Sequence, residues 1–398
     1  MRLNKQLRLL ALYNVLAAFR IADAVWVLFL LRRGFSLAQA GLAEGLFHVV
    51  SLLCEVPSGM AADLLGRRRT LAVSGLCGLL SGVAMALSEN FFGVCVSMAL
   101  CALMYNFASG TLEAITYDSL IAADRRGDYL RVSAFMNGLS RTSAAVSCVL
   151  GALALALGFV RAYLLSAALC GALAALALAL AEPAVTAAQR AREARPFADL
   201  PARLRAHAAE SVRFLRRQPR AGLLILADGA VGVPIYLTFM FAQRHFADGG
   251  LPAAWLGAVL LGVRLAGTAG VALGARGRGP LARAAAGFCL LAGAGTLLAG
   301  LSRLWPVCAL GAAAASLADG AADLRLEARL NDLFPSDRRA TLVSVNSMVY
   351  SLLMIAVSPL AGAVGDRWGA GGAIALTGAL LLLGTAAALL LRAARRRA

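Results

Sequence analysis

The sequence predicts an all-α membrane protein with twelve transmembrane helices, and its composition and apolar runs carry this prediction. The chain has 398 residues, of which 60% are hydrophobic and 15% are charged. A soluble protein of ordinary composition carries about 25% charged residues. Apolar runs of about 20 residues recur from end to end, and each is long enough to cross a bilayer as a helix. Closed β-barrels can also span lipid, but these runs are too long and too continuously apolar for barrel strands.

The expected helices follow one another closely, apart from one long polar connection. We place them at residues 7–31, 38–61, 71–88, 91–119, 133–157, 160–181, 221–243, 254–275, 284–301, 304–328, 341–363 and 371–391. Six precede and six follow a basic, partly amphipathic connection. The expected domains are an N-terminal six-helix bundle (1–181), a cytoplasmic linker (182–220) and a C-terminal six-helix bundle (221–398).

The charge distribution predicts how the chain is oriented. The net charge is +17, which in a soluble protein would indicate nucleic-acid binding. Here the arginines gather in alternate connections, such as Arg67 to Arg69 and Arg125 to Arg126, as expected of cytoplasmic loops. We therefore expect no nucleic acid as partner. We expect a multi-pass protein of a prokaryotic cytoplasmic (inner) membrane, with both termini cytoplasmic and anionic lipids at that face. The basic N-terminus leads into an uncleaved first span.

The two expected halves share a short internal repeat. Residues 112–126 read LEAITYDSLIAADRR and residues 326–339 read LEARLNDLFPSDRR. Each copy follows the fourth expected span of its half. Parallel repeats about an axis along the membrane normal are a transporter architecture, with the binding site near the repeat interface. The repeat therefore favours two related six-helix bundles around a central cavity.

One loop carries the clearest motif. Residues 55–71 read EVPSGMAADLLGRRRTL, with the pattern Gly59, Asp63, Gly66, Arg67 and Arg68. This pattern resembles the signature between the second and third spans of the major facilitator superfamily. Residues 55–59 and 110–118 also resemble a bacterial branch with many drug or multidrug exporters. The resemblance covers nearly the whole chain and implies a fold of two six-helix bundles.

The residue types of this loop suit a conformational latch, which is the role that the resemblance implies. Gly59 permits close approach of a neighbouring helix, and Gly66 permits a positive φ. Asp63 can accept hydrogen bonds at a helix N-terminus, whereas the arginines hold the loop in the cytoplasm. The alternative is a loop that only sets topology. A similar stretch at 362–369 is expected on the outer side, so the sequence predicts no second latch there.

Three departures from the family pattern leave the coupling mechanism open. Residues 106–110 lack the arginine that the family often ties to proton coupling, and the expected fifth span has no proline. The corresponding loop of the second half, residues 270–283, keeps glycines and arginines but has no Asp. Drug–proton antiport is therefore compatible with the residues but not required by them.

Ionisable residues inside the first-half spans are candidate sites, because charge at membrane depth is costly. Arg20 and Asp23 lie at i, i+3 and form either a self-neutralising pair or part of a cavity. Glu44 and His48 lie at i, i+4 and are the best proton-handling pair, although Glu44 is near a solvated end. In the fourth span, Glu113 is the deeper carboxylate and lies on the same helix face as Tyr117. Glu113 either binds a cation or a proton, or it pairs with Arg141 of the fifth span.

The second half contributes further carboxylates. Asp228 lies early in the seventh span, and Asp319 and Asp323 lie at i, i+4 in the tenth. Arg264 of the eighth span could neutralise one of the latter two. The set forms either a balanced structural network or a gating and coupling network. The excess of acids over bases inside the spans favours cationic or amphipathic cargo over anions.

Enzyme motifs are not found in the sequence. It contains no GxxxxGK[ST], HExxH or GxSxG, and its eight cysteines all lie in apolar runs. We therefore expect no enzyme activity, no cofactor and no metal site. The predicted function is proton-coupled efflux of small amphipathic or cationic compounds by a monomeric secondary transporter. The alternatives are proton-coupled or facilitative uptake of a metabolite, and a non-transporting membrane sensor on the same fold.

Overall fold

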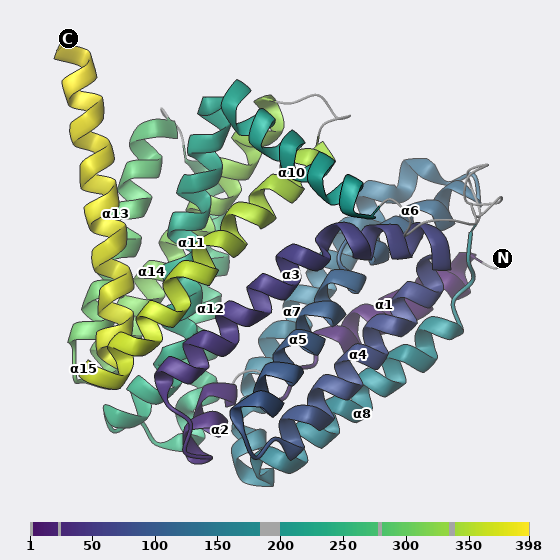
Figure 1. Ribbon diagram of the computed structural model, residues 1–398, viewed down its shortest axis with the longest axis horizontal. Coiled ribbons are helices and arrows are strands. Elements are labelled where there is room, and N and C mark those ends of the chain that lie inside the picture. Colours follow the sequence, from purple (N-terminus) through teal and green to yellow (C-terminus); the bar gives the residue numbers. More distant parts are fainter. Residues whose placement is uncertain (1–2, 23–24, 184–199, 278–280, 334–338, 398) are drawn as a thin grey trace. The chain divides into compact units, whose positions relative to one another are not determined.

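The computed structural model describes residues 3–22, 25–183, 200–277, 281–333 and 339–397, and in this part the chain is helical without strands (Figure 1). The side chains of a few residues inside helices, Asp63 and Arg141 among them, lie outside the described part, as does all of Asp23. Within the described ranges, nine segments are long and apolar enough to cross a membrane. This confirms an all-helical protein with many spans.

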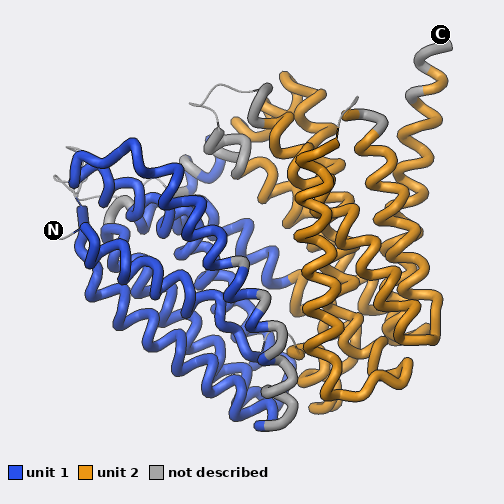
Figure 2. The backbone as a smooth tube through the Cα atoms, turned by 180° about the vertical axis from the view of Figure 1, so that it is seen from behind, with its two compact units in different colours: residues 1–24, 46–209 blue, residues 25–45, 210–398 orange. Residues whose placement is uncertain are grey.

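The chain divides into two compact units, coloured separately in Figure 2. Unit 1 comprises residues 1–24 and 46–209, and unit 2 comprises residues 25–45 and 210–398. The helices that begin in unit 1 are α1 (Leu3–Ala18), α4 (Arg67–Leu87), α5 (Phe91–Ala108), α6 (Thr111–Ile121), α7 (Tyr129–Leu157), α8 (Phe159–Leu178) and α10 (Leu200–Arg217). Helix α3 (Leu37–Leu65) begins in unit 2 and continues into unit 1.

Unit 2 contains the remaining helices of the described chain. They are α2 (Trp26–Arg32), α11 (Pro219–Asp248), α12 (Ala253–Arg276), α13 (Leu281–Leu301), α14 (Trp305–Leu333) and α15 (Arg339–Arg397). Helix α15 changes direction at Gly369, where φ is 78° and ψ is 170°. A positive φ is readily adopted by glycine alone, so the last two expected spans meet at this residue.

Two expected helices are interrupted in the structure. The span expected at 91–119 divides into α5 and α6, because Gly110 adopts a left-handed conformation with φ of 70°. The span expected at 7–31 is divided between α1, which ends at Ala18, and α2, which begins at Trp26. Apolar character continues through both interruptions, which is why hydropathy predicted unbroken helices. The number of twelve transmembrane helices stays a prediction.

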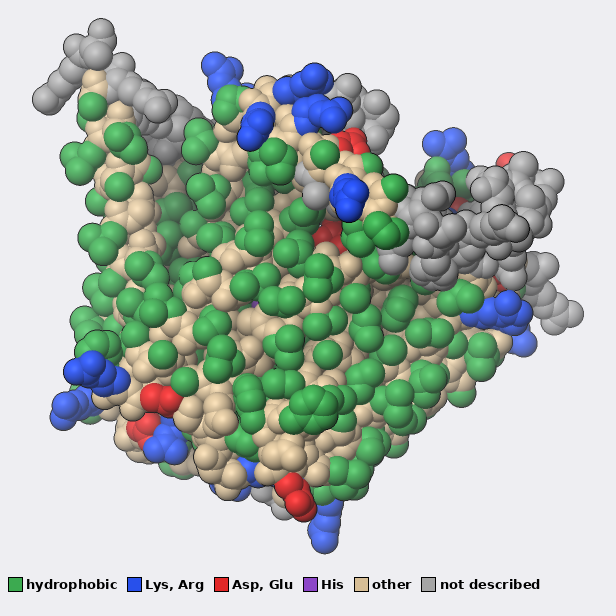
Figure 3. Space-filling model, in the orientation of Figure 1, with side chains coloured by type: hydrophobic (Ala, Val, Ile, Leu, Met, Phe, Trp, Pro, Cys, Tyr) green, Lys and Arg blue, Asp and Glu red, His purple; other side chains and the backbone are tan. Residues whose placement is uncertain are grey.

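Small residues set the packing between helices. A Cβ added at Gly75 in α4 would come within 2.6 Å of the Ala174 backbone in α8, and one at Gly295 in α13 within 2.7 Å of the Gly311 carbonyl in α14. Such close approach is typical of transmembrane helix contacts. Larger hydrophobic side chains cover the helix sides on the face drawn in Figure 3, where lysines and arginines lie toward helix ends. This distribution is that of a protein solvated by lipid along its helices.

Candidate functional site

The motif loop lies in a tight turn between two helices. Helix α3 ends at Leu65, Gly66 has a φ of 83°, and α4 begins at Arg67. The Arg67 guanidinium forms an ion pair with Asp118 of α6 and donates a hydrogen bond to the Ala114 carbonyl. The Asp118 side chain is only 8% exposed, so this is a largely buried ion pair. The arginine that the motif predicts is therefore bound to α6.

A carboxylate from far along the chain caps the same turn. Glu182 Oε1 accepts a hydrogen bond from the Arg67 backbone N–H (2.9 Å), and Oε2 accepts one from the Arg68 N–H (2.7 Å). The neighbouring Ala181 is held by Gln6, which donates to its carbonyl and accepts from its N–H. Sequence reasoning missed Glu182 because it is the first residue of the expected linker. Its signal was a lone acid directly after an apolar span.

Two motif residues, Gly59 and Asp63, add no contact to this description of the turn. The Asp63 side chain lies outside the described part, and a Cβ added at Gly59 would meet no described atom within 4 Å. The close helix approach expected at Gly59 is therefore not seen. The latch role of the motif stays a prediction.

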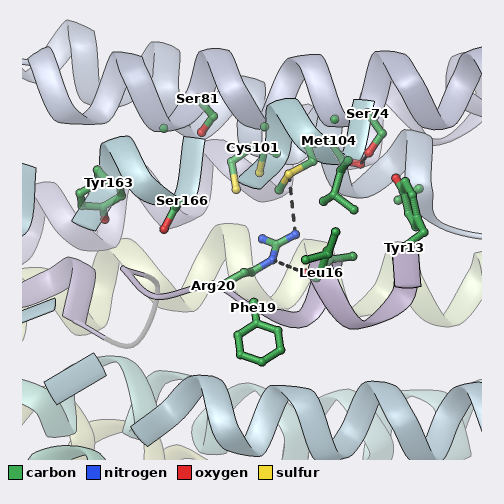
Figure 4. A pocket seen from close by; sticks show the side chains of 17 residues that line it. Tyr13, Leu16, Phe19, Arg20, Ser74, Ser81, Cys101, Met104, Tyr163 and Ser166 are labelled. Atoms are coloured by element: carbon green, nitrogen blue, oxygen red, sulfur yellow. Dashed lines mark hydrogen bonds between the residues drawn. The ribbon is translucent and has the colours of Figure 1, made fainter. Parts of the chain in front are cut away.

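A cavity of about 80 Å³ lies inside unit 1, between α1, α4, α5 and α8. Arg20, just after α1, lies between Tyr13 with Ser74 at one end and Tyr163 with Ser166 at the other (Figure 4). Its guanidinium carbon is 4.1 Å from the centre of the Tyr105 ring, and Nη2 is 3.7 Å from Met104 Sδ. A cation–π contact of this kind stabilises a cation away from bulk water.

The hydroxyl groups of the cavity are largely engaged with backbone. Tyr13 donates to the Leu71 carbonyl (3.4 Å) and Ser74 to the Met104 carbonyl (2.7 Å), whereas the buried Ser166 Oγ has no hydrogen-bond partner among the described residues. An unpaired hydroxyl beside a cation is a group that a polar solute can bind. The sequence analysis identified Arg20 but not these hydroxyls, because serines in apolar runs resemble packing residues.

The first-half candidates divide into buried and exposed groups. Glu44 and His48 of α3 are only 2% and 7% exposed, although the sequence placed Glu44 near a solvated end. In α6, Glu113 is exposed and Asp118 is buried, so the buried carboxylate is one that the sequence analysis did not select. The Tyr117 ring packs edge-on against Tyr129 at 4.9 Å. The expected pairs with Asp23 and Arg141 lie outside the described part.

One further first-half residue explains a departure from the family pattern. Asn106, at the position where the family often has an arginine, donates from Nδ2 to the Ser51 carbonyl (2.7 Å) and accepts from Ser51 Oγ (2.8 Å). This double hydrogen bond joins α5 to α3 within unit 1. Position 106 therefore has a structural partner in this chain.

Carboxylates from three helices act electrostatically on one tyrosine in unit 2. The charges of Glu44, Asp319 and Asp228 all act on Tyr350 of α15, and Asn346 donates a hydrogen bond to Asp228 (3.2 Å). Asp319 lies within reach of the charges of Asp228 and of Asp323. We call Glu44, Asp228, Asp319, Asp323 and Tyr350 the acidic cluster. Sequence reasoning predicted its carboxylates but missed Tyr350 and Asn346.

The arginine expected to neutralise this cluster is placed elsewhere. The guanidinium of Arg264 in α12 lies over the Phe239 ring, 4.3 Å from its centre. Between Arg264 and either Asp319 or Asp323, both described, no ion pair is formed within 4 Å. The expected balanced pair with Arg264 is therefore not formed in this structure.

Comparison with known protein families identifies the family to which the chain belongs. A model of the Major Facilitator Superfamily (MFS) matches residues 12–318, which is more than half of the chain. The chain belongs to the Major Facilitator Superfamily. The MFS is a family of transporters and not of enzymes, and this membership together with the apolar helices makes the chain a multi-pass membrane protein.

Individual relatives are distant. The chain is 28% identical over 109 residues to the uncharacterized MFS-type transporter YxaM of Bacillus subtilis (strain 168), a match spanning 27% of each protein. A solved bacterial homologue of the human lysosomal transporter Spinster has a TM-score of 0.75 at 14% identity, covering 96% of this chain and 95% of that one. The nucleoside transporter NupG has a TM-score of 0.72 at 12% identity, covering 97% and 98%. These structures share the MFS fold with this chain.

Proposed function

We propose that this MFS protein is a secondary active transporter that exports small amphipathic or cationic compounds in exchange for protons. Its two six-helix halves, residues 1–181 and 221–398, rock around a central cavity and expose it to each side in turn. In this proposal α15 provides two spans on either side of Gly369, and α7 and the α1–α2 pair complete the set of twelve. The protein acts as a monomer in a prokaryotic inner membrane with both termini inside.

The acidic cluster is the observation that carries this proposal. Asp228 and Asp319 lie in helices that are long and apolar enough to cross a membrane, and the charges of Asp228 and Asp323 act on Asp319. Like charges held close together away from bulk water repel one another strongly. A proton or a cationic solute that binds there relieves this repulsion. Release of that repulsion by either occupant is the physical basis of exchange between proton and cation.

Uptake of a metabolite is the second candidate, and the cavity of unit 1 favours it. Arg20 lies among hydroxyl groups of Tyr13, Ser74 and Ser166 in this cavity. A guanidinium with neighbouring hydroxyls suits a solute that carries an anionic group. A nucleoside transporter is among the solved structures with the same fold. The non-transporting sensor remains the third candidate.

The motif loop completes the proposed mechanism. Gly59, Asp63, Gly66, Arg67 and Arg68 form a cytoplasmic latch that holds when the cavity opens outward, as the family resemblance implies. The structure supports one part of this, because the Arg67–Asp118 ion pair and the Glu182 cap hold the turn rigidly in unit 1.

Proton flux in vesicles tests the proposal. The full chain is reconstituted in vesicles containing phosphatidylglycerol, a pH gradient is imposed, and internal pH is followed as tetraphenylphosphonium, ethidium, a nucleoside or a dipeptide is added. Export predicts proton movement with the two cations, whereas uptake predicts it with the nucleoside or dipeptide. Silence with every compound contradicts proton-coupled transport of all four and leaves facilitative uptake or the sensor.

The acidic cluster is tested in the same assay. Asp228→Asn and Asp319→Asn each remove one carboxylate and preserve shape, and we expect each to lower coupled proton flux by at least about tenfold. The matched control is Asp248→Asn, because Asp248 is exposed and paired with Arg244 at the end of α11. Normal flux in both cluster variants would remove these carboxylates from the coupling mechanism.

A further inference from the structure

The beginning of α3 is bound to α15 by two kinds of contact, both inside unit 2. Asp366 Oδ1 accepts a hydrogen bond from the Leu37 N–H (2.7 Å), and Oδ2 accepts one from the Ala38 N–H (3.1 Å). The carboxylate therefore caps the N-terminus of α3 across 329 positions of sequence. It satisfies two of the backbone donors that the first turn of a helix leaves unpaired, and its charge favours the positive end of the helix.

Small residues form the second contact. Helix α3 carries Gly41 and Gly45, and the facing stretch of α15 carries Ser358 and Gly362. A Cβ added at Gly41 would overlap the Ser358 carbonyl, and one at Gly362 would overlap the Leu37 carbonyl. Ser358 Oγ also donates to the Gly41 carbonyl (3.0 Å). This spacing of small residues lets two transmembrane backbones touch without long side chains between them.

These contacts lie at the opposite end of α3 from the motif loop. The helix has 29 residues, so its two ends are about 43 Å apart. Its first nine residues belong to unit 2 and the rest to unit 1. One continuous helix is thus held at its start by α15 and continues at its end into the Gly66 turn.

We propose that Asp366 and this glycine contact form a releasable latch at the outer end of α3, which opens once in each transport cycle. This inference rests on the proposed alternating-access function. The sequence analysis set the 362–369 stretch aside as a mere copy of the motif, whereas its Asp366 caps a helix. Asp366 is exposed to solvent, so water can replace its hydrogen bonds when α3 leaves. The glycine faces separate without leaving a buried charge unpaired.

Accessibility of a cysteine tests the latch without any transport assay. Leu37 is 6% exposed, so a cysteine introduced by Leu37→Cys reacts with a membrane-impermeant maleimide only when α3 leaves α15. The native cysteines are measured as background in the chain without this substitution. We expect slow but measurable labelling, about fivefold faster with Asp366→Ala and intermediate with Asp366→Asn, which keeps one acceptor oxygen. The control Asp248→Asn leaves the rate unchanged.

A cross-link tests whether release is required. A Cβ added at Gly365 lies 3.3 Å from Leu37 Cβ, close to the spacing that a disulfide needs. Leu37→Cys with Gly365→Cys should therefore oxidise readily, abolish labelling and stop proton flux, with recovery of both on reduction.

Each of these experiments has an outcome that would overturn the proposal. Equal labelling rates in the Asp366→Ala and Asp366-containing proteins would show that Asp366 does not hold the contact. Labelling that never rises above background in either protein would show a fixed packing contact. Full proton flux in the oxidised pair would show that release is unnecessary. Absence of proton flux from the start would count against the proposed function alone, since the labelling rates still decide the latch.

Discussion

Two helix N-termini in this protein are capped in the same way but supported differently. Glu182 caps α4 and Asp366 caps α3, and each spreads its two oxygens over two successive backbone N–H groups. Beside the α4 cap lies the largely buried Arg67–Asp118 ion pair. Beside the α3 cap lie glycines and the exposed edge of α15. One end is supported by paired charge and the other by close backbone packing.

This difference determines which end can open repeatedly. Separating a buried ion pair leaves a charge without its partner in a poorly solvated place, which costs several kcal/mol. Separating two glycine faces exposes backbone that stays hydrogen-bonded within its own helix. The α4 end is therefore suited to remain rigid, and the α3 end is suited to move.

Breaking the ion pair should have the largest effect on stability. Asp118→Ala leaves Arg67 without its partner and should destabilise unit 1 by about 3 kcal/mol or more. Thermal unfolding of the purified protein in detergent measures the loss. The double variant Arg67→Ala with Asp118→Ala should recover part of it. Equal stability of wild type and Asp118→Ala would remove the distinction between the two capped ends.

Filling the glycine contact should have the next largest effect. Gly41→Ala places a methyl group against the Ser358 carbonyl, and overpacking of this kind typically costs about 1–3 kcal/mol. The control is Gly262→Ala in α12, where an added Cβ meets no described atom within 4 Å. We expect a lower unfolding temperature for the first variant only. If both behave alike, the close approach of α3 and α15 is not a tight contact.

Removing the cap of α4 should have a smaller effect. Glu182→Ala deletes both acceptors for the Arg67 and Arg68 N–H groups, and loss of a helix cap typically costs about 1 kcal/mol. Faster amide hydrogen exchange in the first turn of α4, without change in α8, would report this loss. Unchanged exchange at Arg67 and Arg68 would show that water replaces the carboxylate freely.

Breaking an exposed ion pair should have the smallest effect on stability. Arg244 and Asp248 pair at i, i+4 with both side chains nearly half exposed. Arg244→Gln should change stability by less than about 0.5 kcal/mol, because exposed pairs contribute little. The same thermal unfolding measurement applies. A loss of stability comparable to that of Asp118→Ala would mean that burial does not determine how much an ion pair stabilises this protein.

The sequence predicted most of the helices because a membrane-spanning helix requires only a local run of apolar residues. An apolar run of about 20 residues needs no knowledge of its neighbours, and the expected segments fall on the observed helices. The break at Gly110 was missed since glycine is also common in unbroken transmembrane helices. The family signature identified Arg67, but its partner Asp118 and the cap Glu182 lie outside the motif.

The site was predictable in part for the same reason. The carboxylates of the acidic cluster were visible as rare charges in apolar helices. Their arrangement around Tyr350 depends on α3, α11, α14 and α15 meeting, which no local pattern records. Asp366 matches the aspartate of the motif, but the sequence places it on the outer side of the membrane. For that reason no latch was predicted there. Its partner is the first turn of a helix more than 300 positions away.

Helix α10 has a consequence for the conditions under which the protein is handled. It is strongly amphipathic and its last turn carries Arg216 and Arg217, with Arg205 and Arg213 also exposed. Each arginine near an anionic bilayer surface contributes about 1 kcal/mol of attraction, which fades over a Debye length of about 8 Å at physiological salt. We therefore expect ionic strength to weaken the hold of α10 on the headgroups. Added salt should therefore lower the affinity of α10 for vesicles with anionic headgroups before it affects any apolar span.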